Sequence, residues 1–261
     1  MNSSNRPVAL VTGASSGIGA AMARELARHG YDLVLSARSL RAMETLAEEL
    51  RALGATVTIS PANLAERGAA AALAREIGAV GLEIDVLINN AGLGAFGRFD
   101  RTRASRVAEM MQVNITALTE LTHALLPPML ARGHGKIVLV ASTASFIPCP
   151  YFAVYGATKA YVRSFGEALA QELRGSGVTV NVLCPGATAT NFFDVAGNPP
   201  TLLQRGRMMT ADAVARIGYR GMARGERVTI AGIANHVLAF LVTHTPHFLT
   251  LPAAAKMLAK D

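Results

Sequence analysis

The chain has 261 residues, of which 51% are hydrophobic and 16% are charged. This size and composition exclude a disordered or collagen-like protein and predict one domain with a substantial core. The formal net charge of +7 would suit nucleic acid or anionic lipid, but the basic residues are spread along the chain and no nucleic-acid-binding motif accompanies them, so we expect no nucleic-acid partner.

Short apolar runs alternate with segments of helical period. The predicted strands are Val8 to Thr12, Asp32 to Ala37, Thr56 to Ser60, Ile84 to Asn89, Lys136 to Ala141, Val178 to Cys184 and Arg227 to Ile230. The predicted helices are Gly17 to His29, Leu40 to Leu53, Leu64 to Gly78, Arg103 to Leu130 and Ala153 to Arg174. Parallel strands need crossover helices, so the alternation predicts an α/β fold with a doubly wound parallel sheet and helices on both faces.

The sequence carries no sign of export. Met1 to Arg6 contains no apolar run of the kind that begins a signal peptide. The two cysteines, Cys149 and Cys184, lie beside prolines in apolar segments, which favours buried free thiols in a reducing compartment. We therefore expect a cytoplasmic protein.

An uncharged stretch runs from Val228 to Ala255, without Asp, Glu, Lys or Arg. Gly232, Pro246 and Pro252 interrupt it, so a membrane-spanning helix is not expected. One interpretation is a helix buried against the sheet or a neighbouring subunit. The alternatives are a peripheral membrane contact or an apolar substrate lid, and a truncation near Thr229 that stayed monodisperse and equally active would exclude both. The histidines in this region are too irregularly placed to predict a metal site.

A glycine-rich turn directly follows the first predicted strand. Its sequence, Thr12 to Gly19, has the spacing Gly-x-x-x-Gly-x-Gly, which differs from the GxGxxG of two-domain dehydrogenases. Glycines allow close approach of the backbone, and a helix N-terminus offers unpaired N–H groups and partial positive charge. The turn therefore predicts a phosphate-binding site.

Tyr155 and Lys159 lie one helical turn apart. A tyrosine hydroxyl normally titrates at roughly 10, so it is a poor acid or base near neutrality unless a fixed positive charge favours its phenolate. Lys159 would supply that charge. The pair predicts proton transfer to or from a carbonyl oxygen.

With Thr12 to Gly19, Asn89-Asn90-Ala91-Gly92, Asn114, Ser142 and the Tyr155/Lys159 pair in one chain, the sequence resembles the short-chain dehydrogenase/reductase family from about Val8 to Thr190. The resemblance implies a single Rossmann-like domain over 1–261 that binds NAD or NADP and interconverts carbonyls and alcohols. The core would span about 8–190, followed by a substrate lid region at 191–226 and an apolar C-terminal extension at 227–261. Relatives commonly assemble through two-fold axes, so a homodimer or homotetramer is expected.

The resemblance also assigns catalytic roles. Tyr155 would protonate the carbonyl oxygen, or take the alcohol proton in the reverse direction. Lys159 would lower the tyrosine pKa and bond the nicotinamide ribose. Ser142 would donate to the carbonyl oxygen, and Asn114 would hold a water that links Lys159 to solvent. Taken singly, Ser142 would also suit a strand-end cap and Asn114 an ordinary polar group inside a helix.

The end of the second strand bears on cofactor choice, because NAD-specific relatives place a carboxylate there. Ala37 stands in that place, and Arg38 would pair with a 2′-phosphate unless it is merely solvated, so we expect NADP(H). Asn63 replaces an aspartate found in many relatives, yet still offers an amide oxygen to adenine. The expected cofactor-binding residues are Gly13, Ser15, Ser16, Gly17, Ile18, Gly19, Arg38, Asn63, Leu64, Asn90, Ala91, Gly92, Tyr155, Lys159, Pro185, Gly186 and Thr188.

An apolar pocket is expected at the carbonyl end. The expected pocket residues are Ser142, Phe96, Phe146, Phe152 and Phe192, although such aromatics also suit an ordinary core. Arginines cluster at Arg98 to Arg106 and recur at 216, 220 and 224, where they would either be solvated or meet an acyl thioester or a lipid headgroup.

The leading hypothesis is an NADP(H)-dependent oxidoreductase that reduces an apolar or acyl-linked ketone, 3-oxoacyl or steroid-like, to a secondary alcohol. One alternative is an epimerase or dehydratase that retains its cofactor. Another is a nucleotide-sensing binding protein without turnover.

Overall fold

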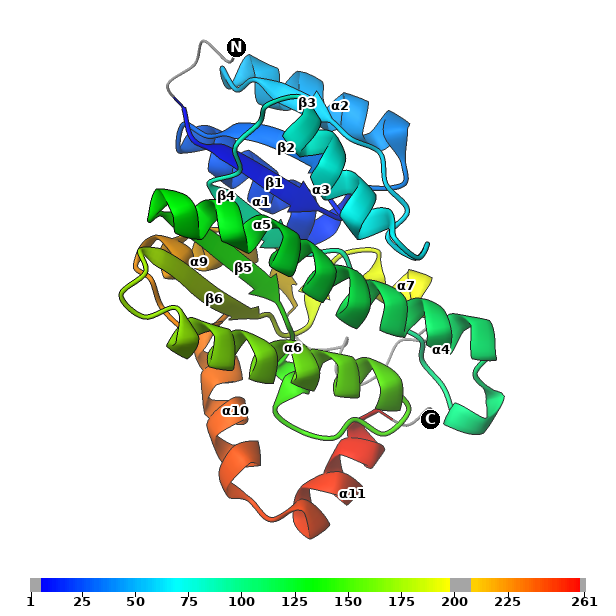
Figure 1. The fold of residues 1–261 in the computed structure, drawn as a ribbon. Helices are drawn as coiled ribbons and strands as arrows, with labels where there is room; N and C mark the ends of the chain where they lie inside the picture. The colour runs from blue at the N-terminus through cyan, green and yellow to red at the C-terminus, as the bar shows by residue number, and fades with distance from the viewer. Residues whose placement is uncertain (1–5, 198–207, 259–261) are drawn as a thin grey trace.

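Parallel strands form the central sheet (Figure 1). The computed structural model describes residues 6–197 and 208–258. In order across the sheet, the strands are β3 (Val57–Ile59), β2 (Asp32–Ser36), β1 (Val8–Thr12), β4 (Val86–Asn89), β5 (Gly135–Val140), β6 (Val178–Cys184) and β9 (Val228–Ile230). The strand order reverses between β1 and β4, and a doubly wound sheet binds its ligand at the carboxyl ends of the strands beside such a point.

Helices cover both faces of the sheet. The helices on one face are α1 (Gly17–Arg28), α2 (Leu40–Ala52) and α9 (Ala211–Ala223). Those on the other are α3 (Ala69–Ala79), α5 (Leu118–Arg132) and α6 (Ala153–Glu172). The predicted α/β, Rossmann-like architecture is confirmed.

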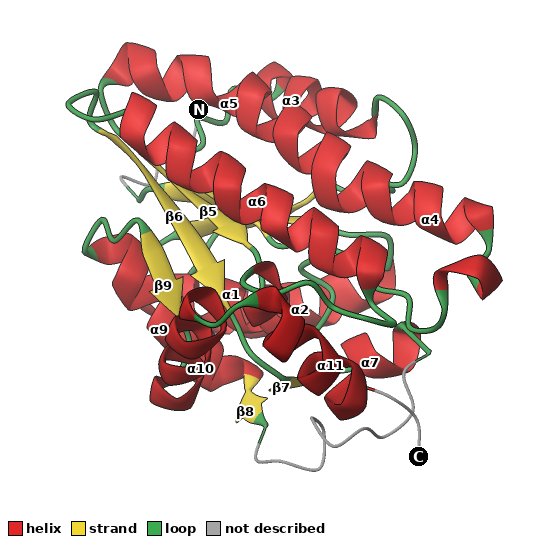
Figure 2. Cartoon of the chain, turned by 90° about the horizontal axis from the view of Figure 1, so that it is seen from below, coloured by secondary structure: helices red, strands yellow, loops and turns green. Residues whose placement is uncertain are grey.

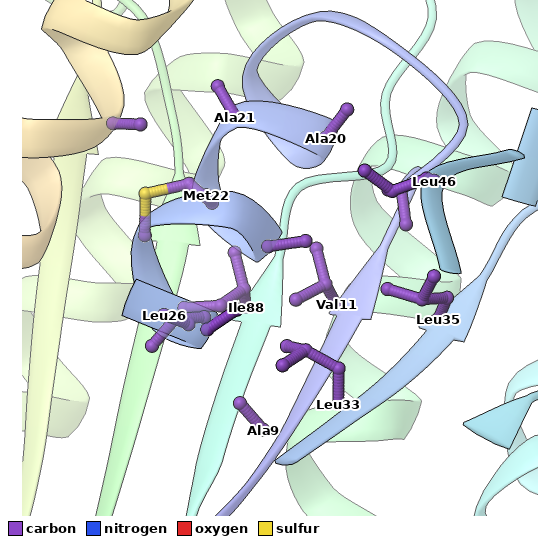
Figure 3. Packing of buried hydrophobic residues seen from close by; sticks show 14 of the residues in the cluster. Ala9, Val11, Ala20, Ala21, Met22, Leu26, Leu33, Leu35, Leu46 and Ile88 are labelled. Carbon is purple, nitrogen blue, oxygen red and sulfur yellow. The ribbon is translucent and has the colours of Figure 1, made fainter. Parts of the chain in front are cut away.

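The core between α1 and the sheet fixes the helix beside the first strand. Met22 and Leu26 of α1 lie over Val11 of β1 and Ile88 of β4, and none of the four side chains is exposed (Figure 3). Burial of each such side chain contributes about 2 kcal/mol. This packing holds the N-terminus of α1 at the carboxyl end of β1.

Two predicted helices differ from the observed ones. The helix predicted from Leu64 begins at Ala69, because Gly68 has a left-handed φ of 78° and cannot continue a helix backwards. The long helix predicted from Arg103 is a continuous rod, formed by α4 (Ala104–Met111), a π-helical segment η2 (Gln112–Ala117) and α5. Apolar periodicity does not distinguish that π segment from an α-helix.

The remaining elements are the short helices η1 (Phe99–Arg101), η3 (Thr143–Ser145) and α7 (Phe192–Val195), the two-stranded β7 (Thr188–Ala189) and β8 (Met209–Thr210), and the helices α10 (Ile233–His244) and α11 (His247–Leu258). Of these, β7, β8, α7, α10 and α11 lie beyond the carboxyl ends of the strands (Figure 2). Part of the expected lid region, 198–207, and residues 259–261 of the expected extension lie outside the described residues.

The uncharged stretch forms α10 and α11, which we call the C-terminal hairpin. The hairpin projects from the body of the molecule (Figure 1). Ala239 is the one described residue of α10 that is buried, so the interpretation of a helix buried against the sheet is wrong. None of the described helices is long and apolar enough to cross a membrane.

Both cysteines are free thiols, as expected. Cys184 is buried at the end of β6, and Cys149 is partly buried.

Candidate active site

A cavity of about 810 Å³ opens at the carboxyl ends of the strands. Most of the expected cofactor-binding residues line it. These are Gly13, Ser15, Ser16, Gly17, Ile18, Arg38, Asn63, Leu64, Asn90, Ala91, Gly92, Tyr155, Lys159, Pro185, Gly186 and Thr188. Gly19 does not line the cavity but is buried directly beneath the turn. The sheet and its loops thus gather residues from the whole core into one site.

The glycine turn is shaped for close backbone packing. Gly13 has a φ of 64°, and a Cβ there would lie 2.8 Å from Nδ2 of Asn90. A Cβ on Gly19 would collide with the carbonyl oxygen of Gly13. Ser16, the N-cap of α1, makes no capping bond with its side chain, so the first-turn N–H groups have no side-chain acceptor. This cradle fits a phosphate.

Asn90 holds the turn against β4. Its backbone N–H donates to Oγ1 of Thr12 at 3.0 Å, and its Nδ2 donates to the Thr12 carbonyl oxygen at 3.0 Å. The backbone N–H of Ala91 donates to the same Thr12 hydroxyl at 3.1 Å. The Asn-Asn-Ala-Gly run therefore braces the phosphate turn as well as lining the cavity.

The end of β2 presents a cation and no acid to the cavity. Arg38 lines the wall, is exposed and makes no ion pair with any residue in the described ranges. Beside it, Oγ of Ser36 is buried and has no hydrogen-bond partner in the described structure. Among the described residues that line the cavity, none is Asp or Glu. An adenosine phosphate would therefore meet a positive charge and no carboxylate here.

Tyr155 lies in the first turn of α6, enclosed by aromatic rings. Its ring centroid lies 5.8 Å from that of Phe152 and 5.1 Å from that of Phe192. Burial raises the pKa of Tyr155 to about 12, while a hydrogen bond with Ser142 acts in the opposite direction. The hydroxyl is therefore protonated near neutral pH, which suits a proton donor.

Lys159 is buried one turn further along α6. Its Nζ donates to the carbonyl oxygen of Val140 at 2.7 Å and lies 5.8 Å from the Tyr155 ring centroid. Burial lowers the pKa of Lys159 to about 8. The expected lowering of the tyrosine pKa by this ammonium is not found, because burial, which disfavours both charged forms, is the larger influence at each group.

Asn114 lies in the π-helical segment, and its side-chain amide makes three hydrogen bonds. Oδ1 accepts from the Leu93 N–H at 2.8 Å, and Nδ2 donates to the Leu93 carbonyl oxygen at 2.9 Å and to Oγ1 of Thr158 at 3.0 Å. The Thr158 hydroxyl donates in turn to the Tyr155 carbonyl oxygen at 2.8 Å. Asn114 thus ties α6 to the loop after β4, which is a structural role beside the expected catalytic one.

We expect Asn114→Ala to destabilise the fold as well as lower activity. The substitution leaves two buried Leu93 groups and the Thr158 hydroxyl with one partner fewer, at a cost of about 3 kcal/mol in all. That loss corresponds to a decrease in Tm of roughly 6 to 12 °C, measurable by circular dichroism. Thr116→Ala, in the exposed part of the same segment, is the matched control and should leave the Tm unchanged. Equal Tm values for the two variants would contradict this role.

Sequence comparison identifies the family. The sequence model of the family described as short chain dehydrogenase matches residues 7–198. The chain belongs to the short-chain dehydrogenase family. It is an oxidoreductase acting on alcohols and carbonyl compounds.

Two relatives show the range of the family. This dehydrogenase is 30% identical to the 17-beta-hydroxysteroid dehydrogenase type 3 of Mus musculus, over 91% of this chain and 76% of the relative. It is 34% identical to a very-long-chain 3-oxoacyl-CoA reductase-like protein of Arabidopsis thaliana, over 80% of this chain and 70% of the relative.

Two solved structures share the fold. A short-chain dehydrogenase from Sphingobium yanoikuyae in complex with NADPH has a TM-score of 0.81 at 34% identity, covering 92% of this chain and 96% of that one. A short chain dehydrogenase/reductase from Burkholderia phymatum in complex with NAD has a TM-score of 0.82 at 28% identity, covering 92% and 94%. Similar folds therefore accompany both cofactors.

Only some of the residues expected to line the substrate pocket of the dehydrogenase lie in the cavity wall. Ser142, Phe152 and Phe192 line the cavity. Phe96 does not, and packs behind Phe152 with ring centroids 5.2 Å apart. Phe146 also lies outside the wall, with the Arg163 guanidinium 4.3 Å from its ring centroid. Phe146 is the C-cap of η3, which turns its side chain onto the core beside α6.

Hydrogen bonds from Arg106 and Phe96 hold α7 in place beside the active site of the dehydrogenase. Nη2 of Arg106 donates to the Gly94 carbonyl oxygen at 2.9 Å and to the Val195 carbonyl oxygen at 3.4 Å. The Phe96 N–H also donates to the Ala196 carbonyl oxygen at 2.9 Å. These bonds fix α7, and with it Phe192, against the loop after β4.

Sequence reasoning missed part of the cavity wall. The C-terminal hairpin of the dehydrogenase contributes Leu238, Ala239, Val242, Thr250, Ala253, Ala254 and Leu258. In the sequence, only the uncharged stretch from Val228 to Ala255 points to these residues, because a substrate lid is one of its interpretations. Cys149 and Ile147 also line the wall, and no pattern singled them out as pocket residues.

Proposed function

We propose that this dehydrogenase reduces apolar ketones to secondary alcohols with NADPH. The observation that carries the proposal is the buried Tyr155–Lys159 pair beside Ser142, in a cavity whose other end carries Arg38 and no carboxylate.

Different cavity residues would bind the cofactor and polarise the ketone. The turn from Gly13 to Gly19 would hold the pyrophosphate at the N-terminus of α1, and Pro185, Gly186 and Thr188 would hold the nicotinamide end. NADPH supplies the hydride when it is bound along this cradle. Ser142 donates a hydrogen bond to the ketone oxygen and polarises it.

The two residues proposed to transfer the proton, Tyr155 and Lys159, both lie on α6. Tyr155 protonates the ketone oxygen, as its high pKa keeps its proton in place until charge develops on that oxygen. Lys159, with a pKa of about 8, carries a proton at neutral pH and is the group that renews it. Asn114 positions this helix through Thr158, which fixes the Tyr155 backbone.

Arg38 supports the preference for NADPH over NADH. Its guanidinium is unpaired among the described residues and follows Ala37, which stands where a carboxylate would select NAD. Structures of relatives with NADPH and with NAD have similar folds, so the fold alone does not select the cofactor and the proposed preference rests on this residue.

The substrate end supports an apolar ketone. Its wall holds Phe152, Phe192, Ile147 and the hairpin residues, and among the described lining residues the charged ones are Arg38 and Lys159 alone. The named relatives include a 17-beta-hydroxysteroid dehydrogenase and a very-long-chain 3-oxoacyl-CoA reductase-like protein, and a steroid nucleus and a long acyl chain are both apolar.

The arginine cluster is half paired. Arg98 pairs with Asp100 at 2.9 Å and Arg106 with Glu109 at 2.9 Å, whereas Arg101 and Arg103 are exposed and make no ion pair within the described residues.

We expect the rate of ketone reduction to fall as the pH rises through about 8. The lowered pKa of Lys159 means that its proton is present below this pH and lost above it, whereas Tyr155 stays protonated across the range. In the limiting case kcat falls about tenfold per pH unit above 8. Initial rates at saturating NADPH and ketone between pH 6 and 10 test this, and a profile that stays flat or rises would contradict it.

A carbonyl panel tests the proposed function. Steroids, 3-oxoacyl thioesters, quinones and small aldehydes are offered with NADPH and with NADH, and cofactor oxidation is followed by absorbance. We expect turnover with NADPH and apolar ketones. Turnover confined to small aldehydes, or faster with NADH, would contradict the proposal.

A further inference from the structure

The outer face of the C-terminal hairpin is an exposed apolar surface. Its most exposed large apolar residues on α10 are Ile233, Val237, Phe240 and Leu241, and on α11 they are Phe248 and Leu249, with exposed fractions from 53% to 85%. The α10 residues recur at helical spacing, so they form one stripe along the helix. Exposed apolar patches of this kind mark contact sites in soluble proteins.

The opposite face of the same hairpin lines the active-site cavity. Leu238, Ala239 and Val242 of α10 and Ala254 and Leu258 of α11 belong to the wall. The two helices are therefore the partition between the cavity and the exposed stripe. A partner bound to the outer face would be separated from the cavity by the hairpin alone.

Three polar side chains at the corner of the hairpin bond to carbonyl oxygens of α10. Thr243 donates to the Ala239 carbonyl oxygen at 2.7 Å, and Thr245 donates to that of Leu241 at 2.7 Å. Nδ1 of His244 lies 2.8 Å from the Phe240 carbonyl oxygen, to which it can only donate. Side chains that bond within their own helix lower the cost of moving the corner out of water.

The charges of the chain suit an anionic surface. No Asp or Glu follows Glu226 within the described residues, and Lys256 of α11 is exposed. The whole chain has a formal net charge of +7. A membrane rich in anionic lipid attracts such a protein before any apolar contact forms.

We propose that the C-terminal hairpin docks onto the surface of an anionic phospholipid bilayer, with its outer stripe inserted among the lipid chains. A projecting corner that carries Phe240, Leu241, Phe248 and Leu249 can enter a deformable leaflet (Figure 1). An apolar ketone dissolved in that leaflet would then reach the cavity past the hairpin. This last step rests on the proposed function, whereas the docking does not.

Vesicle binding tests the proposal with the full chain. Vesicles of phosphatidylcholine with roughly a third phosphatidylglycerol are compared with pure phosphatidylcholine in a flotation assay. We expect binding to the anionic vesicles, weakened by salt, and a decrease of about tenfold or more in the double variant Phe240→Ser, Phe248→Ser. The matched control is Phe99→Ser with Val80→Ser, which removes exposed apolar side chains outside the hairpin and should bind like the wild type.

Three further readouts decide the interpretation. The chain has no tryptophan, so Phe248→Trp provides a single fluorophore whose emission should shift to the blue when anionic vesicles are added. Turnover of a small water-soluble ketone should be equal in the wild type and the hairpin double variant, since neither phenylalanine lines the cavity.

Absence of vesicle binding by the wild type would overturn the proposal. If the hairpin substitutions then dissociated an oligomer, the stripe would be the contact with a second copy of the chain.

Discussion

Tyr155→Phe should lower kcat for ketone reduction by about a thousandfold. The substitution removes one hydroxyl from a buried ring and leaves its packing against Phe152 and Phe192 in place. Proton donation to the ketone oxygen is lost, while the phosphate cradle and Lys159 are unaltered. Steady-state rates with NADPH give kcat.

Tyr161→Phe is the matched control for this variant. Tyr161 lies on the same helix, is 38% exposed, and its hydroxyl lies 3.0 Å from Oγ1 of Thr119. Removal of that hydroxyl should leave kcat within a factor of about two, since surface substitutions rarely alter a distant site. Near-wild-type kcat in Tyr155→Phe, or an equal loss in both variants, would show that Tyr155 is not the proton donor.

Arg38→Ala should weaken NADPH binding by roughly 10- to 100-fold and leave NADH binding unchanged. A charge-assisted contact to the 2′-phosphate contributes about 1.5 to 3 kcal/mol, and NADH has no group that would make it. The side chain is exposed at the end of β2, so its removal should not disturb the fold. Titration with each cofactor measures the two Kd values.

Arg41→Ala controls for a general loss of positive charge. Arg41 is exposed in the first turn of α2 and does not line the cavity. Its removal should alter the Kd for NADPH by no more than about twofold, as expected for a screened surface charge. The selectivity argument would be wrong if Arg38→Ala weakened NADPH and NADH alike, or weakened neither.

The sheet and the catalytic residues could be predicted because both leave local marks in the sequence. Strands buried on both faces read as short apolar runs, and the helices between them keep their own period. Tyr155 and Lys159 are separated by one turn of α6, so their proximity follows from position alone, whereas the family resemblance places Ser142 beside them.

The rest depends on contacts between distant segments. The π-helical turn at Asn114 is recognisable only once the Leu93 backbone is beside it. Phe146 packs beneath Arg163 rather than on the cavity wall because η3 turns its side chain toward the core, which no periodicity records.

Burial likewise decided the pKa of Tyr155. The sequence places an ammonium one turn away, but not the enclosure by Phe152 and Phe192 that raises that pKa. The apolar stretch from Val228 to Ala255 was compatible with a buried helix and with a lid, and only the three-dimensional position of α10 and α11 distinguishes them.

The stoichiometry of cofactor consumption tests the central claim most directly. An apolar ketone is incubated with the purified enzyme and excess NADPH, and the alcohol formed is compared with the NADPH oxidised. Net reduction predicts one NADPH oxidised for each molecule of alcohol. Product formed without net NADPH oxidation would identify an epimerase or dehydratase that recycles its cofactor, and binding of NADPH without turnover of any carbonyl would identify a sensor. Either result would contradict the proposed reduction by Tyr155 and Lys159.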